Sequence, residues 1–208
     1  MASRVTRRRG ILFVVSAPSG AGKTTLCREA RLRLPDLTYS VSYTTRAPRR
    51  GEIEGTDFIF VSEATFRSLQ ERGEFAEWAI VHGNLYGTRA TVLEDALREG
   101  RDVLLDIDTQ GATQLRARYP EAVLVFIVAP TLAELNQRLR ERRSDVETEI
   151  ARRLARARDE VKQWRRYDYL VVNRDLKEAA DHLTAIITAE RCRTGRLVLD
   201  IPDLEVPD

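Results

Sequence analysis

Short runs of apolar residues alternate along the chain with longer segments in which apolar positions recur every three or four residues. The runs are rich in β-branched residues and bounded by polar or turn residues, as is typical of parallel strands buried on both faces. The segments between them have the period of an amphipathic helix. This alternation predicts an α/β fold, a parallel sheet with helices on both faces. The predicted strands cover 11–15, 103–105, 123–128 and 169–172, and the predicted helices cover 24–34, 109–118, 132–142, 146–166 and 176–191.

Two segments interrupt this alternation. Between Tyr39 and Tyr86 the pieces SVSYTT, DFIF and FAEWAIV read as short strands separated by glycine and proline, with one helix-like stretch at 63–72. We interpret residues 41–91 as a small mixed β insertion. A second, helical insertion is predicted at 132–158, where Ser144 and Glu147 form an S-x-x-E capping box between two helices. The remaining core covers 10–40, 92–131 and 159–195, and flexible extensions are expected at 1–9 and 196–208.

Composition narrows the class of protein. The 208 residues suffice for one domain with a sizeable core, and 34 basic against 32 acidic residues leave a net charge of +2. No strong field therefore draws the chain to nucleic acid or to an anionic membrane. The apolar stretch behind the basic N-terminus covers only 11–15, whereas a membrane span needs roughly 18 apolar residues. Cys27 and Cys192 lie far apart without a C-x-x-C spacing, which argues against a zinc site and for free thiols in a reducing cytoplasm.

The segment SAPSGAGKTT, residues 16–25, follows the first predicted strand and opens the first predicted helix. It matches the phosphate-binding pattern G-x-x-x-x-G-K-[ST], except that Ala17 replaces the first glycine. In this pattern backbone N–H groups surround a phosphate, the lysine reaches the β- and γ-phosphates, and the hydroxyl binds Mg²⁺. A glycine-rich turn without a nucleotide is the alternative, although lysine occurs at only three positions of the chain. The predicted ATP-binding residues here are Ala17, Pro18, Ser19, Gly20, Ala21, Gly22, Lys23, Thr24 and Thr25.

A second phosphate site is indicated by SYTTRAPRRGE, residues 42–52. Arg46 and Arg49 stand three residues apart in a turn that Pro48 and Gly51 shape. Two guanidinium groups in a loop can grip one phosphate from two directions. In a chain this rich in arginine, the alternative is that both are merely solvated.

A candidate base-recognition residue is Glu77, an acidic residue inside the apolar strand pattern FAEWAIV. A carboxylate that faces inward is costly unless a donor meets it. The guanine edge offers N1–H and the exocyclic amino group, whereas adenine offers only the N1 acceptor at that edge. By the same alternation Glu77 could instead face solvent.

The stretch VLLDIDTQGA places Asp106 and Asp108 at the carboxyl end of a buried strand. Ligands of open parallel sheets bind at that edge, where an aspartate can hold the water shell of magnesium or the acceptor nucleoside. A simple helix-capping role for Asp108 is the alternative.

Together these motifs resemble the guanylate kinases, in the same order and at similar spacing, from Ile11 to about Arg193. The resemblance implies a nucleoside monophosphate kinase fold with a P-loop core, in which the β insertion binds GMP and the helical insertion is a lid. It implies ATP-dependent phosphorylation of GMP, and of dGMP, in purine nucleotide metabolism, with Mg²⁺ accompanying ATP. The motifs that carry it are SAPSGAGKT, SYTTRAPR, the pair Gly51 and Glu52, FAEW, GNLYGT, LDIDTQGA, RLRER and VVN.

The resemblance also implies a role for each matching residue. The implied catalytic residues are Lys23, Arg49 and three lid arginines, Arg138, Arg142 and Arg153. Asn173 would lie near the adenine of ATP, and Thr24 and Asp106 would be on the metal side. The implied GMP-binding residues are Ser42, Arg46, Arg49, Phe58, Glu77, Tyr86, Gly87, Thr88 and Asp106.

Three positions depart from the family pattern. Phe58 stands where the family usually has a tyrosine whose hydroxyl helps to bind the acceptor phosphate. A missing hydrogen bond to a charged group costs about 1.5 to 3 kcal/mol if nothing replaces it, so weaker GMP binding is expected. Arg143 replaces the usual lid glycine, and Arg174 the acidic residue that commonly follows the asparagine of VVN.

Two other functions compete with GMP phosphorylation. A guanylate-kinase-like module uses the same fold to bind phosphorylated partners, but such modules tend to lose the loop lysine that is kept here as Lys23. A kinase of ribose 1,5-bisphosphate has a related chain without the same reason for FAEW and LDID. The predicted partners are therefore the small molecules ATP and GMP, and the pattern does not distinguish a monomer from a homo-oligomer.

Overall fold

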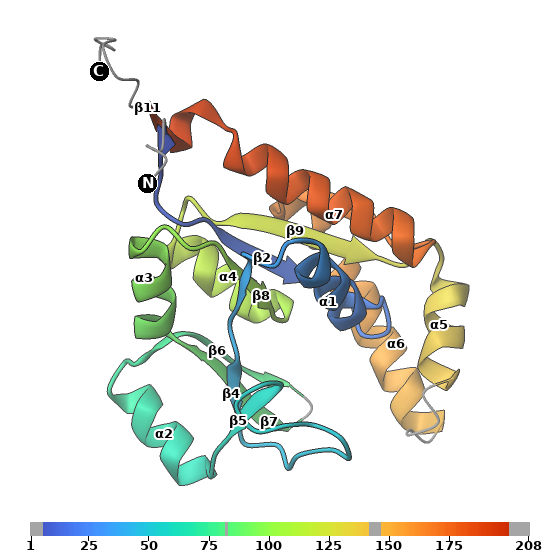
Figure 1. The fold of residues 1–208 in the computed structure, drawn as a ribbon. Coiled ribbons are helices and arrows are strands. Elements are labelled where there is room, and N and C mark those ends of the chain that lie inside the picture. Colours follow the sequence, from blue (N-terminus) through green and yellow to red (C-terminus); the bar gives the residue numbers. More distant parts are fainter. Residues whose placement is uncertain (1–5, 82, 142–146, 200–208) are drawn as a thin grey trace.

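The centre of the molecule is a five-stranded sheet (Figure 1). The computed structural model describes residues 6–81, 83–141 and 147–199. Every neighbouring pair in the sheet is parallel, so all five strands end at the same edge. The strand order is β10 (Tyr169–Val172), β9 (Val123–Val128), β2 (Leu12–Ser16), β8 (Val103–Asp106) and β3 (Thr38–Tyr39).

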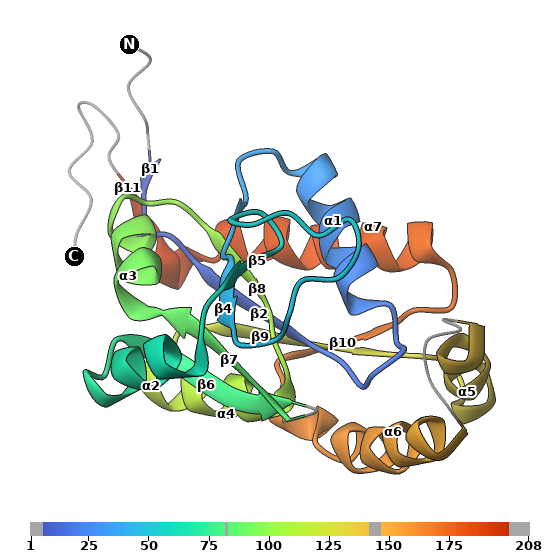
Figure 2. The same cartoon turned by 90° about the horizontal axis from the view of Figure 1, so that it is seen from below.

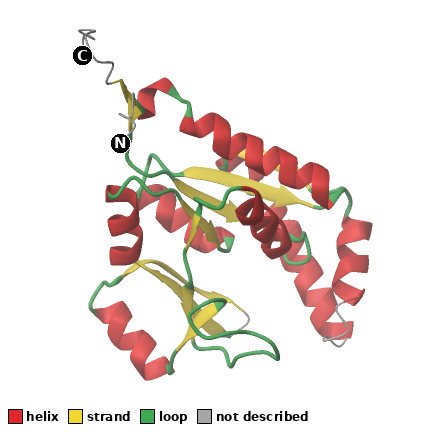
Figure 3. Cartoon of the chain, viewed as in Figure 1, coloured by secondary structure: helices red, strands yellow, loops and turns green. Residues whose placement is uncertain are grey.

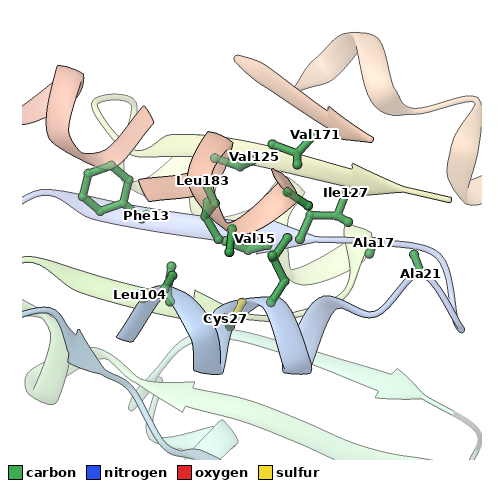
Figure 4. Close-up of a cluster of buried hydrophobic side chains, with 14 of the residues drawn as sticks. Phe13, Val15, Ala17, Ala21, Cys27, Leu104, Val125, Ile127, Val171 and Leu183 are labelled. Carbon is green, nitrogen blue, oxygen red and sulfur yellow. The ribbon is translucent and has the colours of Figure 1, made fainter. Parts of the chain in front are cut away.

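Helices cover both faces of this sheet. Phe13 and Val15 face one side of β2 and pack against one pair of helices, whereas Leu12 and Val14 face the other pair. Figure 4 shows the first of these clusters, in which Leu183 from the C-terminal helix meets the strands. The first face carries α1 (Lys23–Arg33) and α7 (Leu176–Arg191), and the second carries α3 (Ala90–Arg98) and α4 (Thr109–Arg118). The predicted parallel sheet with helices on both faces is therefore confirmed.

A separate four-stranded sheet lies beside the core, below the central sheet in the view of Figure 3. It is mixed, because β4 pairs with β5 in parallel and with β7 in antiparallel orientation, which confirms the predicted mixed β insertion. Phe66 and Phe75 stack in its own small core, with ring centroids 4.5 Å apart. Its elements are β4 (Ser42–Thr44), β5 (Phe58–Phe60), α2 (Glu63–Glu71), β6 (Phe75–Val81) and β7 (Asn84–Arg89).

Side chains of α4 dock the edge strand β6 onto the core. Gln114 accepts a hydrogen bond from the backbone N–H of Trp78 at 3.2 Å and donates one to its carbonyl at 2.7 Å. Arg118 donates to the carbonyl of Phe75 at 3.1 Å. These three bonds occupy backbone groups along the free edge of β6.

Two helices, α5 (Leu132–Glu141) and α6 (Glu147–Val161), project beyond the carboxyl ends of the strands (Figures 1 and 2). A short 3₁₀ turn, η1 (Trp164–Arg166), then leads into β10. The predicted capping box at Ser144, together with Arg142 and Arg143, lies outside the described residues. No helix within the described ranges is long and apolar enough to cross a bilayer.

The predicted elements agree with the observed ones most closely in the core. The strands at 123–128 and 169–172 and the helices at 109–118 and 176–191 match residue for residue. The helix predicted over 146–166 ends earlier, at Val161, before the 3₁₀ turn. Both predicted terminal extensions contain a short strand, since β1 (Thr6–Arg7) pairs with β11 (Val198–Leu199), which follows η2 (Thr194–Arg196).

Helix α3 and strand β7 have no counterpart among the predicted elements. Strand β7 runs directly into α3 without an intervening glycine or proline, and the N-cap residue of α3, Arg89, makes no side-chain capping bond. The usual start signal of a helix is therefore missing from the sequence here.

Candidate active site

The phosphate loop joins β2 to α1 at the carboxyl edge of the central sheet. Gly20 and Gly22 have φ angles of 91° and 87°, in the left-handed region that glycine adopts without strain. Gly22 is the N-cap of α1 and offers no side chain, so the first N–H groups of the helix are left for an anion. Ala17, the departure from the motif, is 7% exposed and belongs to the hydrophobic core, as its position in Figure 4 shows.

Lys23 at the start of α1 is held at the end of β8. Its ammonium group forms an ion pair with the Asp106 carboxylate and donates to the carbonyl of Ile107 at 3.1 Å. The family resemblance implied that Asp106 lies between the acceptor nucleoside and a metal ion. In the structure, the Asp106 carboxylate also positions Lys23. The charge of Lys23 is thereby held at the carboxyl end of β8, next to the phosphate loop.

Arg46 follows strand β4 and is held in place by two neighbours. Its guanidinium donates to both carboxylate oxygens of Glu52, at 2.8 and 3.0 Å, and to the Tyr86 hydroxyl at 3.1 Å. Burial alone would raise the pKa of Glu52, but the hydrogen bonds from Arg46 and from the backbone of Arg49 lower it below its usual value. The simple solvated alternative therefore fails for Arg46, while the Arg49 side chain is exposed.

Phe58 lies beside this arginine. Its ring centroid is 5.3 Å from the Arg46 guanidinium carbon and 5.9 Å from the Tyr86 ring. Phe58 thus supplies an aromatic face to Arg46 but no hydroxyl. The Tyr86 hydroxyl, from strand β7 on the other side of β4, is the phenol that binds the arginine here.

Glu77 on β6 points inward and is 3% exposed, so the solvent-facing alternative is wrong. One carboxylate oxygen accepts a hydrogen bond from the Thr88 hydroxyl at 2.6 Å. Burial raises the pKa of Glu77 to about 7, against an ordinary value of 4.5. The other oxygen lies so close to α4 that a Cβ added at Gly111 would be 2.3 Å from it, and only glycine leaves room for the carboxylate.

Asp108 has the capping role that the sequence left open. Its side chain accepts from the backbone N–H groups of Gln110 at 3.1 Å and Gly111 at 3.0 Å, at the start of α4. It also pairs with Arg156 of α6 at 3.4 Å. The cap fixes the helix end that packs against Glu77.

A single cavity of about 600 Å³ joins the two halves of the candidate site. The predicted residues that line it are Lys23, Thr24, Ser42, Arg46, Arg49, Phe58, Glu77, Tyr86 and Asp106. No role was assigned from the sequence to several further lining residues, among them Arg28, Arg31, Tyr39, Glu52 and Asp57. Arg28 and Arg31 are one helical turn apart on α1, a spacing that could have pointed to them.

Other predicted site residues are not among those that line the cavity. Thr88 and Gly87 lie behind it on β7, and Thr88 acts there through Glu77. Arg138 of α5 donates to the carbonyl of Asn173 at 3.0 Å and to Glu134 at 3.3 Å. Arg153 lies on α6. The structure thus leaves these lid arginines away from the cavity wall, and Arg142 is outside the described residues.

Asn173, predicted to lie near the adenine of ATP, contacts the phosphate loop. It follows β10 directly, is 5% exposed, and its side-chain amide donates to the carbonyl of Ala21 at 2.8 Å.

The fold and site together define a P-loop phosphotransferase, in which Lys23 and Thr24 line one end of the cavity and Arg46 and Arg49 line the other. A family model described as guanylate kinase matches residues 9–190, so the chain belongs to the guanylate kinase family. The guanylate kinase of Geobacter metallireducens is 50% identical over 92% of this chain and 95% of that relative. The guanylate kinase of Nitrosomonas europaea is 51% identical over 89% of this chain and 92% of the relative. The crystal structure of guanylate kinase from Anaplasma phagocytophilum superposes with a TM-score of 0.79 at 36% identity, covering 93% of this chain and 92% of that one.

Proposed function

We propose that the protein transfers the γ-phosphoryl group of ATP to GMP, and to dGMP, forming ADP and the nucleoside diphosphate. The observation that carries this proposal is one cavity with Lys23 and Thr24 at one end and Arg46 and the buried Glu77 at the other. Two phosphate sites and a carboxylate that needs a donor pair fit a triphosphate donor and a guanine nucleotide acceptor. We place the reaction in purine nucleotide metabolism in the cytoplasm, which suits the two free cysteines, Cys27 and Cys192.

Guanine is selected by Glu77. Guanine N1–H and its amino group can donate to the carboxylate, and the Thr88 hydroxyl already donates to one of its oxygens. Donors that face the buried carboxylate offset the desolvation that raises its pKa. Adenine brings an acceptor to the same place and leaves the second carboxylate oxygen without a donor, so AMP is disfavoured.

The acceptor phosphate is bound by the arginines of the turn after β4. Arg46 is already oriented by Glu52 and Tyr86, so little side-chain freedom is lost when a phosphate arrives. Arg49 is exposed at the rim of the same cavity and adds a second guanidinium.

Phosphoryl transfer needs alignment of the two phosphates and stabilisation of the charge that passes between them. Lys23 supplies a fixed positive charge, and α5 and α6 would bring Arg138 and Arg153 to the phosphates by closing. The acceptor oxygen of GMP is already an anion, so no general base is needed. The Thr24 hydroxyl and the Asp106 carboxylate both line the cavity and are oxygen ligands of the kind that Mg²⁺ takes. When bound with ATP, Mg²⁺ would neutralise phosphate charge there.

A coupled assay of ADP release tests this function. With ATP as donor, GMP and dGMP should be phosphorylated, while AMP and ribose 1,5-bisphosphate should give at least 100-fold lower kcat/KM. Comparable turnover of AMP would contradict the role of Glu77, and preference for ribose 1,5-bisphosphate would replace the acceptor assignment. Absence of transfer to any acceptor, with retained phosphopeptide binding, would favour the non-catalytic module.

A further inference from the structure

We propose that Asn173 is a positioning residue that sets the orientation of the peptide between Ala21 and Gly22 in the phosphate loop. The contact spans 152 positions of sequence and joins the end of β10 to the loop after β2. It was not expected from the pattern, which pointed to a contact with the adenine of ATP. This inference rests on the proposed use of ATP and concerns how the loop is made ready for its phosphates.

The hydrogen bond from Asn173 to the Ala21 carbonyl sets the direction in which the next N–H group points. In a trans peptide the carbonyl and the following N–H point in opposite directions. The Asn173 amide holds the Ala21 carbonyl from behind the loop at 2.8 Å, so the N–H of Gly22 is turned the other way, as an anion site requires. Gly22 is the N-cap of α1 with a φ of 87°, and a peptide with such a glycine on one side rotates easily unless something fixes it.

Asn173 is itself held in place by hydrogen bonds to both of its backbone groups, so it can fix the peptide of the loop. Its backbone N–H donates to the carbonyl of Val128 at 2.8 Å, and its own carbonyl accepts from Arg138 at 3.0 Å. The carboxamide packs directly on the loop, because a Cβ added at Gly22 would lie 2.5 Å from its nitrogen. A side chain that is 5% exposed and fixed at both backbone groups has little freedom to turn toward a base.

Apolar side chains of α5 also pack against the loop at Gly20. A Cβ at Gly20 would meet Leu139 at 3.1 Å and Leu135 at 3.3 Å, both on α5. Leucine side chains fill space but do not choose between the two orientations of a peptide. The hydrogen bond from Asn173 is therefore the contact that selects the orientation with the N–H forward.

The two roles of Asn173 predict different responses to the donor base. We compare ATP with inosine triphosphate, whose base carries a 6-oxo group in place of the amino group. Asn173→Ala and the nearly isosteric Asn173→Asp should lower kcat/KM for both donors by the same factor, roughly 10- to 100-fold, because a misoriented loop affects every triphosphate. The KM for GMP should stay within about twofold of the wild-type value, since the acceptor pocket is untouched.

Val171→Ala is the matched control. Val171 is buried on the same strand, two residues before Asn173, and packs in the core shown in Figure 4 without contacting the loop through a hydrogen bond. It should lower the melting temperature without changing kcat/KM for either donor. If the Asn173 variants behave like this control, the positioning role is overturned. If they lose activity with ATP alone, so that the preference for ATP over inosine triphosphate disappears, the residue reads the base and the proposal is wrong.

The pH profile of Asn173→Asp gives a readout that a general loss of stability would not. A protonated carboxyl can donate to the Ala21 carbonyl as the amide does, whereas a carboxylate repels it. Burial at this position raises the pKa of the introduced carboxyl, so the activity of this variant relative to wild type at the same pH should rise several-fold as the pH falls from 8 to 5. Asn173→Ala should show no such rise, and a flat profile for both would count against the hydrogen bond as the cause. Wild-type activity with ATP and GMP tests the proposed function separately, so failure of either idea can be told from failure of the other.

Discussion

In the proposed function, the phosphate loop and the acceptor pocket bind the same chemical group by different means. The loop is one continuous segment, 16–25, that uses backbone N–H groups and the left-handed glycines Gly20 and Gly22. The acceptor pocket uses side chains drawn from β4, β6, β7 and β8. A backbone site tolerates a changed side chain, as Ala17 shows by packing in the core. A side-chain site depends on each charge and each partner, as the buried Glu77 shows.

The largest effect is expected at Lys23, the charged side chain of the loop. Lys23→Ala should reduce kcat with ATP and GMP by on the order of 10³-fold or more, because a fixed charge at the transferring phosphoryl group is lost. Asp106 would lose its partner, so a modest drop in melting temperature is expected. Steady-state kinetics and circular dichroism measure both, and a folded variant with unchanged turnover would remove the loop from the mechanism.

The next effect is expected at the base end of the acceptor pocket. Glu77→Gln should raise the KM for GMP by roughly 10- to 150-fold, corresponding to about 1.5 to 3 kcal/mol for hydrogen bonds to a charged group. The amide can donate to adenine N1, so the discrimination against AMP should shrink. The KM for ATP should not change. Equal discrimination in the variant and the wild type would show that another residue selects the base.

A smaller, graded effect is expected from the pH dependence of Glu77. Its pKa of about 7 means that GMP meets a neutral acid at low pH, so the KM for GMP should rise about tenfold per pH unit below 7. Glu77→Gln should lack this slope.

The raised pKa of Glu77 also makes the stability of the protein depend on pH. Because the folded pKa exceeds the ordinary 4.5, the contribution of Glu77 to stability is fully present below pH 4.5 and is lost as the pH rises through 7.

The loss of unfolding free energy between pH 4.5 and pH 7 that Glu77 causes amounts to about 3 kcal/mol and should be absent from Glu77→Gln. Urea unfolding at several pH values measures it. If the variant and the wild type keep the same difference in unfolding free energy at every pH, burial does not shift this carboxyl.

The smallest effect is expected at Phe58. Phe58→Tyr should lower the KM for GMP by about fivefold, or roughly 1 kcal/mol, because a hydroxyl is added beside the phosphate-binding Arg46. The gain is modest because the Tyr86 hydroxyl already binds this arginine at 3.1 Å. Tyr86→Phe is the matched opposite change and should raise the same KM. An unchanged KM in Phe58→Tyr would mean that the acceptor phosphate does not come within reach of position 58.

Local patterns predicted the parts of the fold that local physics determines. The buried strand at 123–128 and the helix at 176–191 follow directly from their hydrophobic periods. The phosphate loop could be recognised because its chemistry lies within ten consecutive residues. Helix α3 could not be found from boundary signals, because the chain passes from β7 into it with no turn residue.

The acceptor site was only partly predictable because its geometry depends on contacts far apart in sequence. The inward direction of Glu77 is decided by Thr88 and by the close approach of Gly111, neither of which alternation can reveal. Glu52 matched a motif, but its bidentate bond to Arg46 required the turn to be folded. The contact of Asn173 with Ala21 is likewise a tertiary one, and the residue's place in a motif pointed elsewhere.

The bonds from Gln114 and Arg118 to strand β6 have a consequence for the behaviour of the protein in concentrated solution. An uncovered edge strand presents free N–H and C=O groups to which the strand of another molecule can add. On β6, side chains from α4 occupy the backbone groups of Trp78 and the carbonyl of Phe75. The same helix that leaves space for the Glu77 carboxylate at Gly111 therefore also shields the β6 edge of the four-stranded sheet, at Phe75 and Trp78, from the addition of another strand.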